Sequence, residues 1–260
     1  MTTSTPPLPL PPLPASAALF LDFDGTLVAI AERPQDVRVP GWLVPTLHRL
    51  EQRQGGALAL VSGRPISQLD AFLNPLRLMA AGAHGAERRG VSGQIERRLA
   101  DPPAGVAALA LALAADHAGL LFESKPSGFS LHYRARPDLE SMCRDALLAA
   151  VAAEPGADAE WGFLHGHCVF ELKQRSVSKG TALRAFLAEP VFAGRLPIFV
   201  GDDVTDEDGI AAAQAAGGFG VRIGSGPSQA AYRLADTDAV AAWLMAATPD
   251  TPIPKQNPTE

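Results

Sequence analysis

The chain has 260 residues, of which 47% are hydrophobic and 19% are charged. This length and composition allow an ordinary buried core in one or two domains. The net charge of −6 and the lack of a Lys/Arg-rich block argue against nucleic acid as a partner, and the two cysteines, Cys143 and Cys168, have no metal-ligand spacing.

Both ends of the chain are rich in proline. Residues 1–14 hold six prolines and neither Lys nor Arg, so they lack the charged and apolar regions of a secretory signal. We expect a disordered arm over 1–15 and a flexible tail over 248–260. No stretch is apolar for long enough to span a bilayer. The expectation is a cytoplasmic monomer without membrane or nucleic-acid partners.

Short apolar runs alternate with helical patterns in the first and last thirds of the chain. Runs that are apolar on both faces are typical of parallel strands covered by helices on both sides. The predicted strands are 18–23, 57–61, 76–81, 198–200 and 219–223, and the predicted helices are 41–54, 66–72, 179–188 and 206–216. These elements predict a doubly wound α/β core, in which ligands bind outside the carboxyl ends of the strands.

The pattern changes between residues 90 and 174, where helix, two strands, helix and two strands follow one another. The predicted helices are 104–118 and 137–153, and a hairpin turn is expected at 165–167. Polar residues alternate with apolar ones along the strands, so one sheet face is polar. We interpret 90–174 as an inserted α+β domain that faces a core formed by 16–89 and 175–247 across a cleft. The polar positions are Ser130, His132 and Arg134 in one strand and His167, Glu171 and Lys173 in another.

Aspartates follow two of the predicted core strands. Asp22 and Asp24 come directly after the first strand, and an acidic cluster at 202–208 follows the strand at 198–200. If these strands are neighbours, Asp22 is placed to attack a phosphorus atom and Asp24 to protonate the leaving oxygen. Mg²⁺ prefers such oxygen ligands. An acidic turn or a helix cap is the alternative for each cluster taken alone. The predicted metal ligands are Asp22, Asp24 through its carbonyl, Asp202 and Asp206.

Other candidates are suited to holding a phosphoryl group. The hydroxyl of Thr26, the hydroxyl of Ser62 and the N–H of Gly63 are potential hydrogen-bond donors to its oxygens. Lys179 begins a predicted helix, where a cation opposes the macrodipole and is tolerated best beside an anion. Its suggested role is to neutralise Asp22 and the phosphoryl oxygens.

Four segments in this order resemble the haloacid dehalogenase-like phosphatases. They are Asp-x-Asp-Gly-Thr-Leu at 22–27, Ser62, Lys179, and Gly-Asp-Asp-x-Thr-Asp-Glu at 201–207. The resemblance implies an Mg²⁺-dependent phosphotransferase with a Rossmann-like core, Asp22 as nucleophile, Asp24 as acid/base and a mobile cap domain inserted between the second and third motifs.

Within that superfamily the chain resembles the trehalose-6-phosphate phosphatases from Leu19 to about Leu244. The resemblance is carried by Gly-Ala-His-Gly-Ala-Glu at 82–87, Glu-Ser-Lys-Pro at 123–126, Leu-His-Tyr-Arg at 131–134 and Glu-Leu at 171–172. It implies a disaccharide monophosphate as substrate. The residues implied to bind it, beyond Thr26 and Gly63, are Arg64, His84, Lys125, His132, Arg134 and Glu171. Lys173 lacks the proline that commonly follows in this family, so its role is left open.

Two alternatives to this substrate remain. Another sugar phosphatase of the same superfamily, acting on sucrose phosphate or a hexose phosphate, would share the catalytic motifs. A receiver-like phospho-acceptor also combines aspartates, a hydroxyl residue and a lysine on an α/β sheet, although it needs neither Asp24 nor a substrate lid. Comparing kcat/KM across a panel of sugar phosphates tests the first alternative. Release of phosphate over multiple turnovers would exclude the second.

Overall fold

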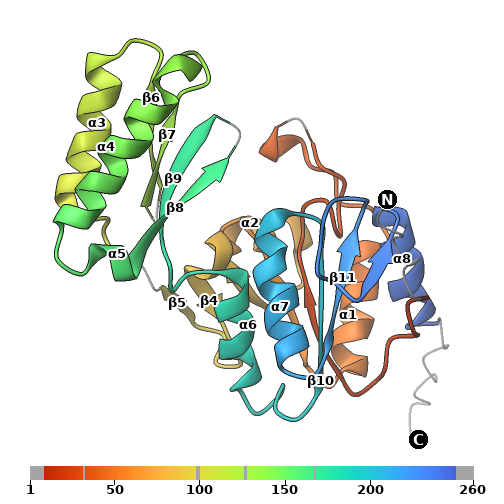
Figure 1. Ribbon diagram of the computed structural model, residues 1–260. Coiled ribbons are helices and arrows are strands. Elements are labelled where there is room, and N and C mark those ends of the chain that lie inside the picture. The colour runs from red at the N-terminus through yellow and green to blue at the C-terminus, as the bar shows by residue number, and fades with distance from the viewer. Residues whose placement is uncertain (1–8, 32, 98–99, 126–127, 167, 250–260) are drawn as a thin grey trace, which may run out of the picture.

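The computed structural model describes residues 9–31, 33–97, 100–125, 128–166 and 168–249. These residues form two units, each built around its own sheet (Figure 1). The terminal segments 1–8 and 250–260, for which an arm and a tail were expected, and His167 of the expected hairpin lie outside the described residues.

The large unit contains an eight-stranded sheet in the order β12-β11-β10-β1-β2-β3-β4-β5. The strands from β12 to β3 are parallel, whereas β4 and β5 are antiparallel additions at one edge. Strand β1 lies between β2 and β10. The loop after β1 therefore lies beside the loops that follow β2 and β10. The strands are β1 (Ala17–Leu21), β2 (Leu58–Val61), β3 (Met79–Gly82), β4 (Glu87–Arg89), β5 (Ile95–Arg97), β10 (Leu196–Gly201), β11 (Phe219–Ile223) and β12 (Tyr232–Leu234).

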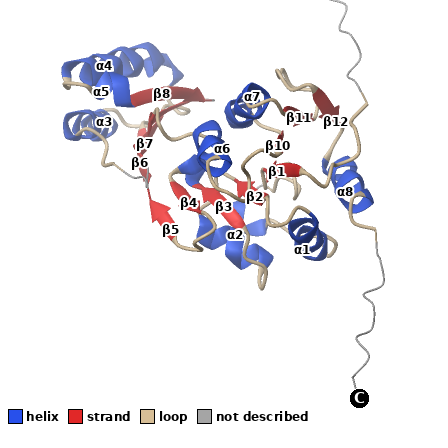
Figure 2. Ribbon diagram, turned by 90° about the horizontal axis from the view of Figure 1, so that it is seen from below, coloured by secondary structure: helices blue, strands red, loops and turns tan. Residues whose placement is uncertain are grey.

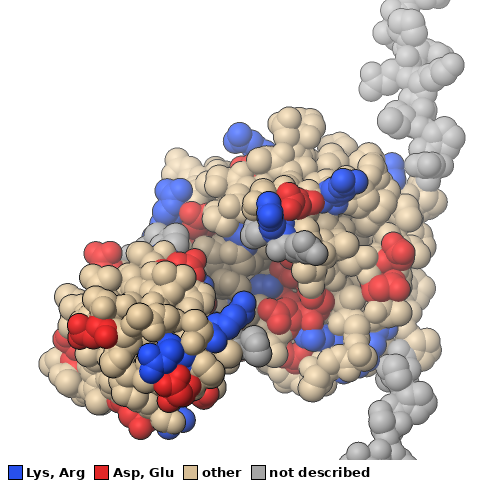
Figure 3. All heavy atoms as spheres, turned by 90° about the horizontal axis from the view of Figure 1, so that it is seen from above, with Lys and Arg blue, Asp and Glu red and all other residues tan. Residues whose placement is uncertain are grey.

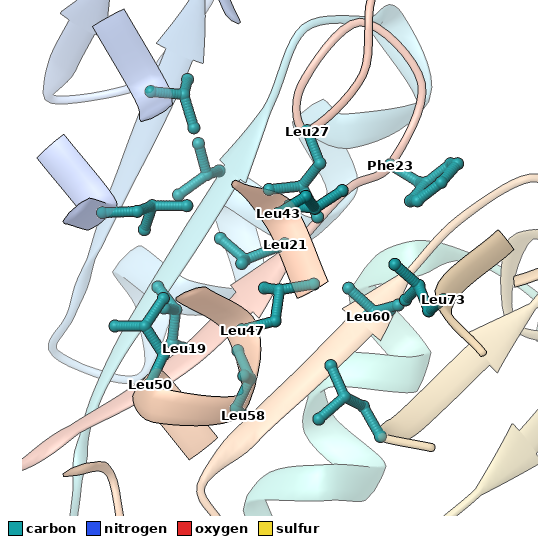
Figure 4. Packing of buried hydrophobic residues seen from close by; sticks show 14 of the residues in the cluster. Leu19, Leu21, Phe23, Leu27, Leu43, Leu47, Leu50, Leu58, Leu60 and Leu73 are labelled. Atoms are coloured by element: carbon teal, nitrogen blue, oxygen red, sulfur yellow. The ribbon is translucent and has the colours of Figure 1, made fainter. Parts of the chain in front are cut away.

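Helices cover both faces of this sheet, as expected for strands that are apolar on both sides (Figure 2). One face packs against α1 (Leu43–Arg53), α2 (Ile66–Leu73) and α8 (Thr237–Ala246), and Figure 4 shows the leucines of this layer meeting those of β1 and β2. The other face packs against α6 (Lys179–Leu187) and α7 (Glu207–Ala215). Every residue of β1 is buried, so the strand that leads to the first aspartates is held on all sides.

The small unit has a four-stranded antiparallel sheet in the order β6-β7-β9-β8, with helices on one face. Its apolar face and helices share a hydrophobic cluster of their own, which includes Phe129, Leu131, Leu147 and Leu172. The predicted alternation along the strands is thereby confirmed. The elements are α3 (Ala104–Asp116), β6 (Leu121–Lys125), β7 (Gly128–His132), α4 (Glu140–Ala153), α5 (Ala157–Glu160), β8 (Trp161–Gly166) and β9 (Val169–Gln174). Single 3-10 turns lie at Pro34–Asp36, Ala83–Gly85, Pro137–Leu139 and Val204–Asp206.

The structure departs from the expected elements at a few places. Strand β5 lies inside the expected insertion 90–174, yet it pairs with β4 in the large unit. His165 belongs to β8 rather than to a turn, because the ladder continues to the pair Gly166 and Val169. Strand β12 and helix α8 were not predicted.

The described part of the expected arm is docked, not disordered. Leu13 is 3% exposed, Arg53 donates a hydrogen bond to its carbonyl oxygen, and Gln54 donates to that of Pro14. Trp243 Nε1 donates to the carbonyl oxygen of Pro11. Because proline carbonyls remain good acceptors, this proline-rich stretch joins α1 and α8 through hydrogen bonds. Among the described helices, none combines the length and the apolar character needed to cross a membrane.

Candidate active site

The candidate catalytic residues lie where β1, β2 and β10 end. Asp22 follows β1, Ser62 follows β2 and Asp202 follows β10. The parallel pairing of β1 with β2 and with β10 brings these three strand ends together at one edge of the sheet. The backbone N–H of Asp22 continues the ladder by donating to the carbonyl oxygen of Val200, 3.0 Å away.

Three carboxylates converge at this edge. One oxygen each from Asp22, Asp202 and Asp206 can be chosen so that all lie within 4.8 Å of one another. Gly25 permits this approach, because its φ of +75° suits glycine and a Cβ there would lie 2.2 Å from Oδ2 of Asp202. Thr26 Oγ1 donates a hydrogen bond of 3.4 Å to Oδ1 of Asp202.

Lys179 supplies the positive charge of the cluster. Its Nζ donates to Oδ1 of Asp22 at 2.8 Å and to Oδ1 of Asp206 at 2.6 Å, and the residue is 3% exposed. It is the first residue of α6, whose N-cap Ser178 forms a capping box with Thr181. Burial alone lowers the pKa of Lys179, but the attraction of the two carboxylates outweighs burial and raises it. The lysine is therefore charged.

Asp206 organises its neighbours. While Oδ1 accepts from Lys179, Oδ2 accepts hydrogen bonds from the backbone N–H groups of Asp202 (3.1 Å) and Asp203 (2.9 Å). The loop after β10 is thus folded around this fully buried carboxylate. Asp206 is near the expected metal position, but both of its oxygens already have donors.

The cluster carries more negative than positive charge. Burial, with the Asp206 carboxylate adding to it, raises the pKa of Asp22 to about 8 despite the opposing charge of Lys179. Burial followed by repulsion from Asp206 and Asp203 also raises the pKa of Asp202. A divalent cation would relieve both effects. Since hard oxygen ligands suit Mg²⁺ or Ca²⁺, the donor set fits such an ion.

Asp24 is turned toward Arg64 instead of the carboxylate cluster. Arg64 Nε donates to Oδ2 of Asp24 at 2.6 Å and Nη2 donates to Oδ1 at 2.7 Å, which is a bidentate ion pair. The guanidinium also lies over the ring of Phe72, 5.0 Å from its centroid, and Nη1 donates to Gln68. Arg64, expected to touch substrate, therefore holds the expected acid/base residue in this arrangement.

Ser62, Gly63 and His84 form another side of the site. The backbone N–H of His84 donates to the carbonyl oxygen of Ser62, and a Cβ on Gly63 would lie 2.8 Å from the His84 ring. His84 has a φ of 57°, which is uncommon for a residue with a side chain. Burial, with the charge of Lys179 next, lowers the pKa of His84 to about 4, so its ring is neutral near pH 7.

The small unit contributes a polar group near this side. Lys125 Nζ donates to Oε2 of Glu171 at 2.6 Å, and the charges of both residues and of Lys173 act on the pKa of His84. Figure 3 shows acidic and basic side chains gathered around the hollow between the two units. Lys125 and Glu171 lie at the end of the small sheet that is nearest the chain connection at 175–178. This end of the sheet lies toward the large unit.

His132 and Arg134 lie farther along the small sheet. The register pairs His132 with Val169, at the opposite end from Lys173 and the chain connection. His132 Nε2 is 2.9 Å from Oε2 of Glu123, whereas Arg134 is exposed and lies beyond the end of β7. No described contact joins either residue to the carboxylate cluster, so the structure does not bring these two candidates to it.

Arg222 is a site residue that sequence reasoning missed. It lies on β11, is 8% exposed, and donates from Nη1 to the carbonyl oxygen of Asp203 at 2.7 Å. Glu207 Oε1 is 3.6 Å from the same nitrogen. The available signal was an arginine within an otherwise apolar strand, because a buried charge needs a partner.

Comparisons with known proteins agree with this geometry. The family model described as trehalose-phosphatase matches residues 20–238. The chain is 41% identical over 236 residues to the trehalose-6-phosphate phosphatase of Escherichia coli (strain K12), covering 90% of this chain and 87% of that protein. Its fold is similar to an Aspergillus fumigatus trehalose-6-phosphate phosphatase structure, with a TM-score of 0.72, 24% identity and coverage of 88% and 91%. It is also similar to a haloacid dehalogenase-like hydrolase from B. subtilis, with a TM-score of 0.57, 17% identity and coverage of 88% and 98%.

Proposed function

The chain belongs to the trehalose-phosphatase family, and from this membership we propose that it hydrolyses trehalose 6-phosphate to trehalose and phosphate through an aspartyl phosphate on Asp22, with Mg²⁺ as cofactor. The observation that supports the proposed mechanism is the close approach of Asp22, Asp202 and Lys179 at the carboxyl ends of β1 and β10. A buried carboxylate beside a lysine and a second carboxylate is suited to attack on a phosphoryl group.

The first proposed step is attack by Asp22. A carboxylate oxygen of Asp22 forms a bond to phosphorus while the bond from phosphorus to the sugar oxygen breaks. Lys179 donates a hydrogen bond to Asp22 in the free protein, and its charge offsets the negative charge that collects during transfer. The N–H of Gly63 is available at the same edge for the phosphoryl oxygens, and the hydroxyl of Thr26 can donate to them once it leaves Asp202.

The proton in this step is assigned to Asp24. Its carboxyl group protonates the departing sugar oxygen, and its carboxylate then takes a proton from the water that attacks the aspartyl phosphate. That second attack releases phosphate and restores Asp22. Because Arg64 engages both oxygens of Asp24, at least one of these hydrogen bonds has to break before Asp24 can donate a proton.

Asp22, the carbonyl of Asp24 and Asp202 are the groups we propose to hold Mg²⁺. When bound, the ion reduces repulsion between the nucleophile and the substrate dianion and polarises the phosphoryl group. Asp206 acts on this site by fixing Lys179 and the backbone of the Asp202 loop.

Recognition of the sugar is assigned to the small unit, which we propose acts as a cap. Lys125 and Glu171 form the polar pair nearest the large unit, and they offer a cation and an acceptor to sugar hydroxyls. Movement of the small unit toward the carboxylate cluster would exclude bulk water from the reacting phosphate.

The direct test is phosphate release from trehalose 6-phosphate with Mg²⁺, compared with sucrose 6-phosphate and glucose 6-phosphate. We expect the highest kcat/KM for trehalose 6-phosphate. Asp22→Asn should abolish turnover while retaining the fold, and Glu171→Gln should raise KM for the disaccharide more than for p-nitrophenyl phosphate. Turnover by Asp22→Asn at the unmodified rate would refute the aspartyl route, and a higher kcat/KM for another ester would refute the proposed substrate.

A further inference from the structure

A groove separate from the carboxylate cluster runs between the two units. It has a volume of about 500 Å³ and is lined by residues of β8 and β9 of the small unit and of α6 and α7 of the large unit. Gly162, Phe163 and Leu164 line one wall, and the alanines at 211, 212 and 215 line the other. This volume is in the usual range for a small-molecule site, about 300 to 1,000 Å³.

Three cations line this groove, and none of them pairs with a carboxylate of the residues that the structure describes. Lys173 and Arg175 come from the chain that leaves the small unit, and Arg184 comes from α6. Within the described ranges, none of the three has a carboxylate oxygen within 4.0 Å. The acidic residue in the lining is Asp208, which is exposed. This local excess of positive charge contrasts with the net charge of −6.

The guanidinium of Arg175 is held in position. Its Nε donates to the carbonyl oxygen of Asp158 at 3.0 Å, and a Cβ on Gly162 would lie 3.0 Å from both Cζ and Nη1 of the same arginine. Its terminal nitrogens have no hydrogen-bond partner among the residues that the structure describes. An arginine fixed through Nε in this way presents its other donors to a ligand at a small entropic cost.

The hydroxyl groups in the lining are already engaged. Ser178 Oγ accepts from the N–H of Thr181, and Thr181 Oγ1 donates to the carbonyl oxygen of Ser178. The remaining recognition elements are therefore the three cations and an apolar wall. A phosphate group suits such a set, because guanidinium groups bind phosphate oxygens through paired hydrogen bonds.

We propose that this groove binds a phosphate-bearing anion between Lys173 and Arg175 on one side and Arg184 on the other. The ligand would join the two units at the point where the chain passes between them. Because it binds to the arrangement described here, it favours that arrangement over one with the small unit moved toward the carboxylate cluster. If the proposed function holds, occupancy of the groove lowers turnover, and by the same coupling a substrate that moves the small unit toward the carboxylate cluster weakens binding in the groove.

The test counts bound phosphate on the full chain in the presence of Mg²⁺. Equilibrium dialysis with radiolabelled inorganic phosphate compares the unmodified protein with the Arg175→Gln/Arg184→Gln variant. Both arginines are exposed, so the fold should persist, which circular dichroism checks. We expect the variant to bind one phosphate fewer per chain, or to bind that phosphate more than about tenfold more weakly.

A matched control is Arg136→Gln/Arg144→Gln. It removes the same charge from the small unit at arginines that pair with Asp138 and Asp145 instead of lining the groove. This control should bind as many phosphates as the unmodified protein. Equal stoichiometry in the groove variant and the unmodified protein would overturn the proposal, and so would an equal loss in the control.

A second probe identifies the form of the ligand. Phenylphosphonate carries an organic group on a C–P bond that a phosphomonoesterase does not hydrolyse. Tighter groove binding of phenylphosphonate than of phosphate supports an organic phosphate ester that uses the apolar wall, and the reverse order supports inorganic phosphate. Binding of neither probe in the groove refutes the site. These measurements need no turnover, so they test the groove even if the protein does not hydrolyse trehalose 6-phosphate.

Discussion

At the residue scale, several side chains in this site act by holding others. Asp206 engages Lys179 and two backbone N–H groups, and Arg222 holds the carbonyl oxygen of Asp203. Such supporting contacts fix the direction in which Asp202 presents its carboxylate. The loop after β10 is thereby restrained from two sides.

Arg222→Gln should weaken Mg²⁺ binding by about tenfold or more, because supporting hydrogen bonds around metal ligands have effects of this size. Isothermal titration calorimetry with Mg²⁺ measures the change. Arg233→Gln is the control, since Arg233 on the neighbouring strand donates to the carbonyl oxygen of Gly224 and not to the acidic loop. Unchanged Mg²⁺ affinity in Arg222→Gln would show that the loop keeps its shape without the arginine.

His84 gives the folded protein a pH-dependent stability. Its pKa is about 4 in the folded state, below its ordinary value of 6.5, so between these values the unfolded chain binds the proton more readily. Stability is therefore expected to fall as the pH drops from 6.5 to 4, by at most about 3 kcal/mol from this group. His84→Asn, which tolerates the positive φ, should reduce that loss in urea unfolding at pH 7 and pH 4.5. Identical pH dependence in the two proteins would exclude His84 as a source.

The sequence allowed us to predict which charged residues lie close together in the site. It was less informative about which of them form ion pairs or hydrogen bonds with one another. Asp22 and Asp202 were predicted to converge because strand ends in a doubly wound sheet share one edge, and Lys179 was predicted to lie beside Asp22 because a cation in the first turn of a helix is tolerated best near an anion. The ion pair of Asp24 with Arg64 was not predicted, since a side-chain rotamer depends on neighbours that no local pattern encodes. For His132 and Arg134, the strand alternation was read correctly, but their distance along the sheet depends on register.

At the scale of elements, the buried parallel strands and the helices between them were predictable, whereas the edges of the sheet were not. Strands β4 and β5 have three residues each and are mostly charged, so they show no hydrophobic period. Their position is held by ion pairs of Arg88 with Glu96 and Glu189 and of Arg89 with Asp70. Pairs of this kind become visible only once the fold brings the partners together.

The N-terminus of α6 positions Lys179, so its cap should affect both stability and catalysis. Ser178→Ala removes the hydrogen bond to the N–H of Thr181 and should lower the free energy of unfolding by about 1 kcal/mol. We expect kcat to fall as well, because Lys179 is the next residue. Asp236→Ala removes the equivalent cap of α8, away from the site, and should cost similar stability without lowering kcat. Equal kcat values for the two variants would show that the Ser178 cap does not affect how Lys179 acts in the site.

At the scale of the whole molecule, the two units have separate hydrophobic clusters. Among the described residues, the cluster of the small unit shares no member with the two clusters of the large unit. The overall α/β class and the interruption by an α+β segment were predictable from the change in pattern. The inclusion of β5 in the large unit was not, because that strand is recognised only through its pairing with β4.

Leu131→Ala in the small unit should raise hydrogen exchange in β6 to β9 while leaving Mg²⁺ affinity unchanged. Leu131 is fully buried, and such truncations destabilise by about 2 to 5 kcal/mol. Leu47→Ala in α1 is the reciprocal variant, expected to raise exchange in the large unit instead. Exchange that rises equally in both units for either variant would mean that they open as one cooperative body.

The position of β1 between β2 and β10 has a consequence for synthesis of the protein on the ribosome. One neighbour of β1, strand β2, is synthesised soon after it. The other neighbour, β10, and the residues Lys179, Asp202 and Asp206 are translated only after the whole small unit. A nascent chain that stops before residue 206 carries Asp22 without its complete set of charged neighbours. The cluster around Asp22 can therefore form only after residue 206 has been added to the growing chain.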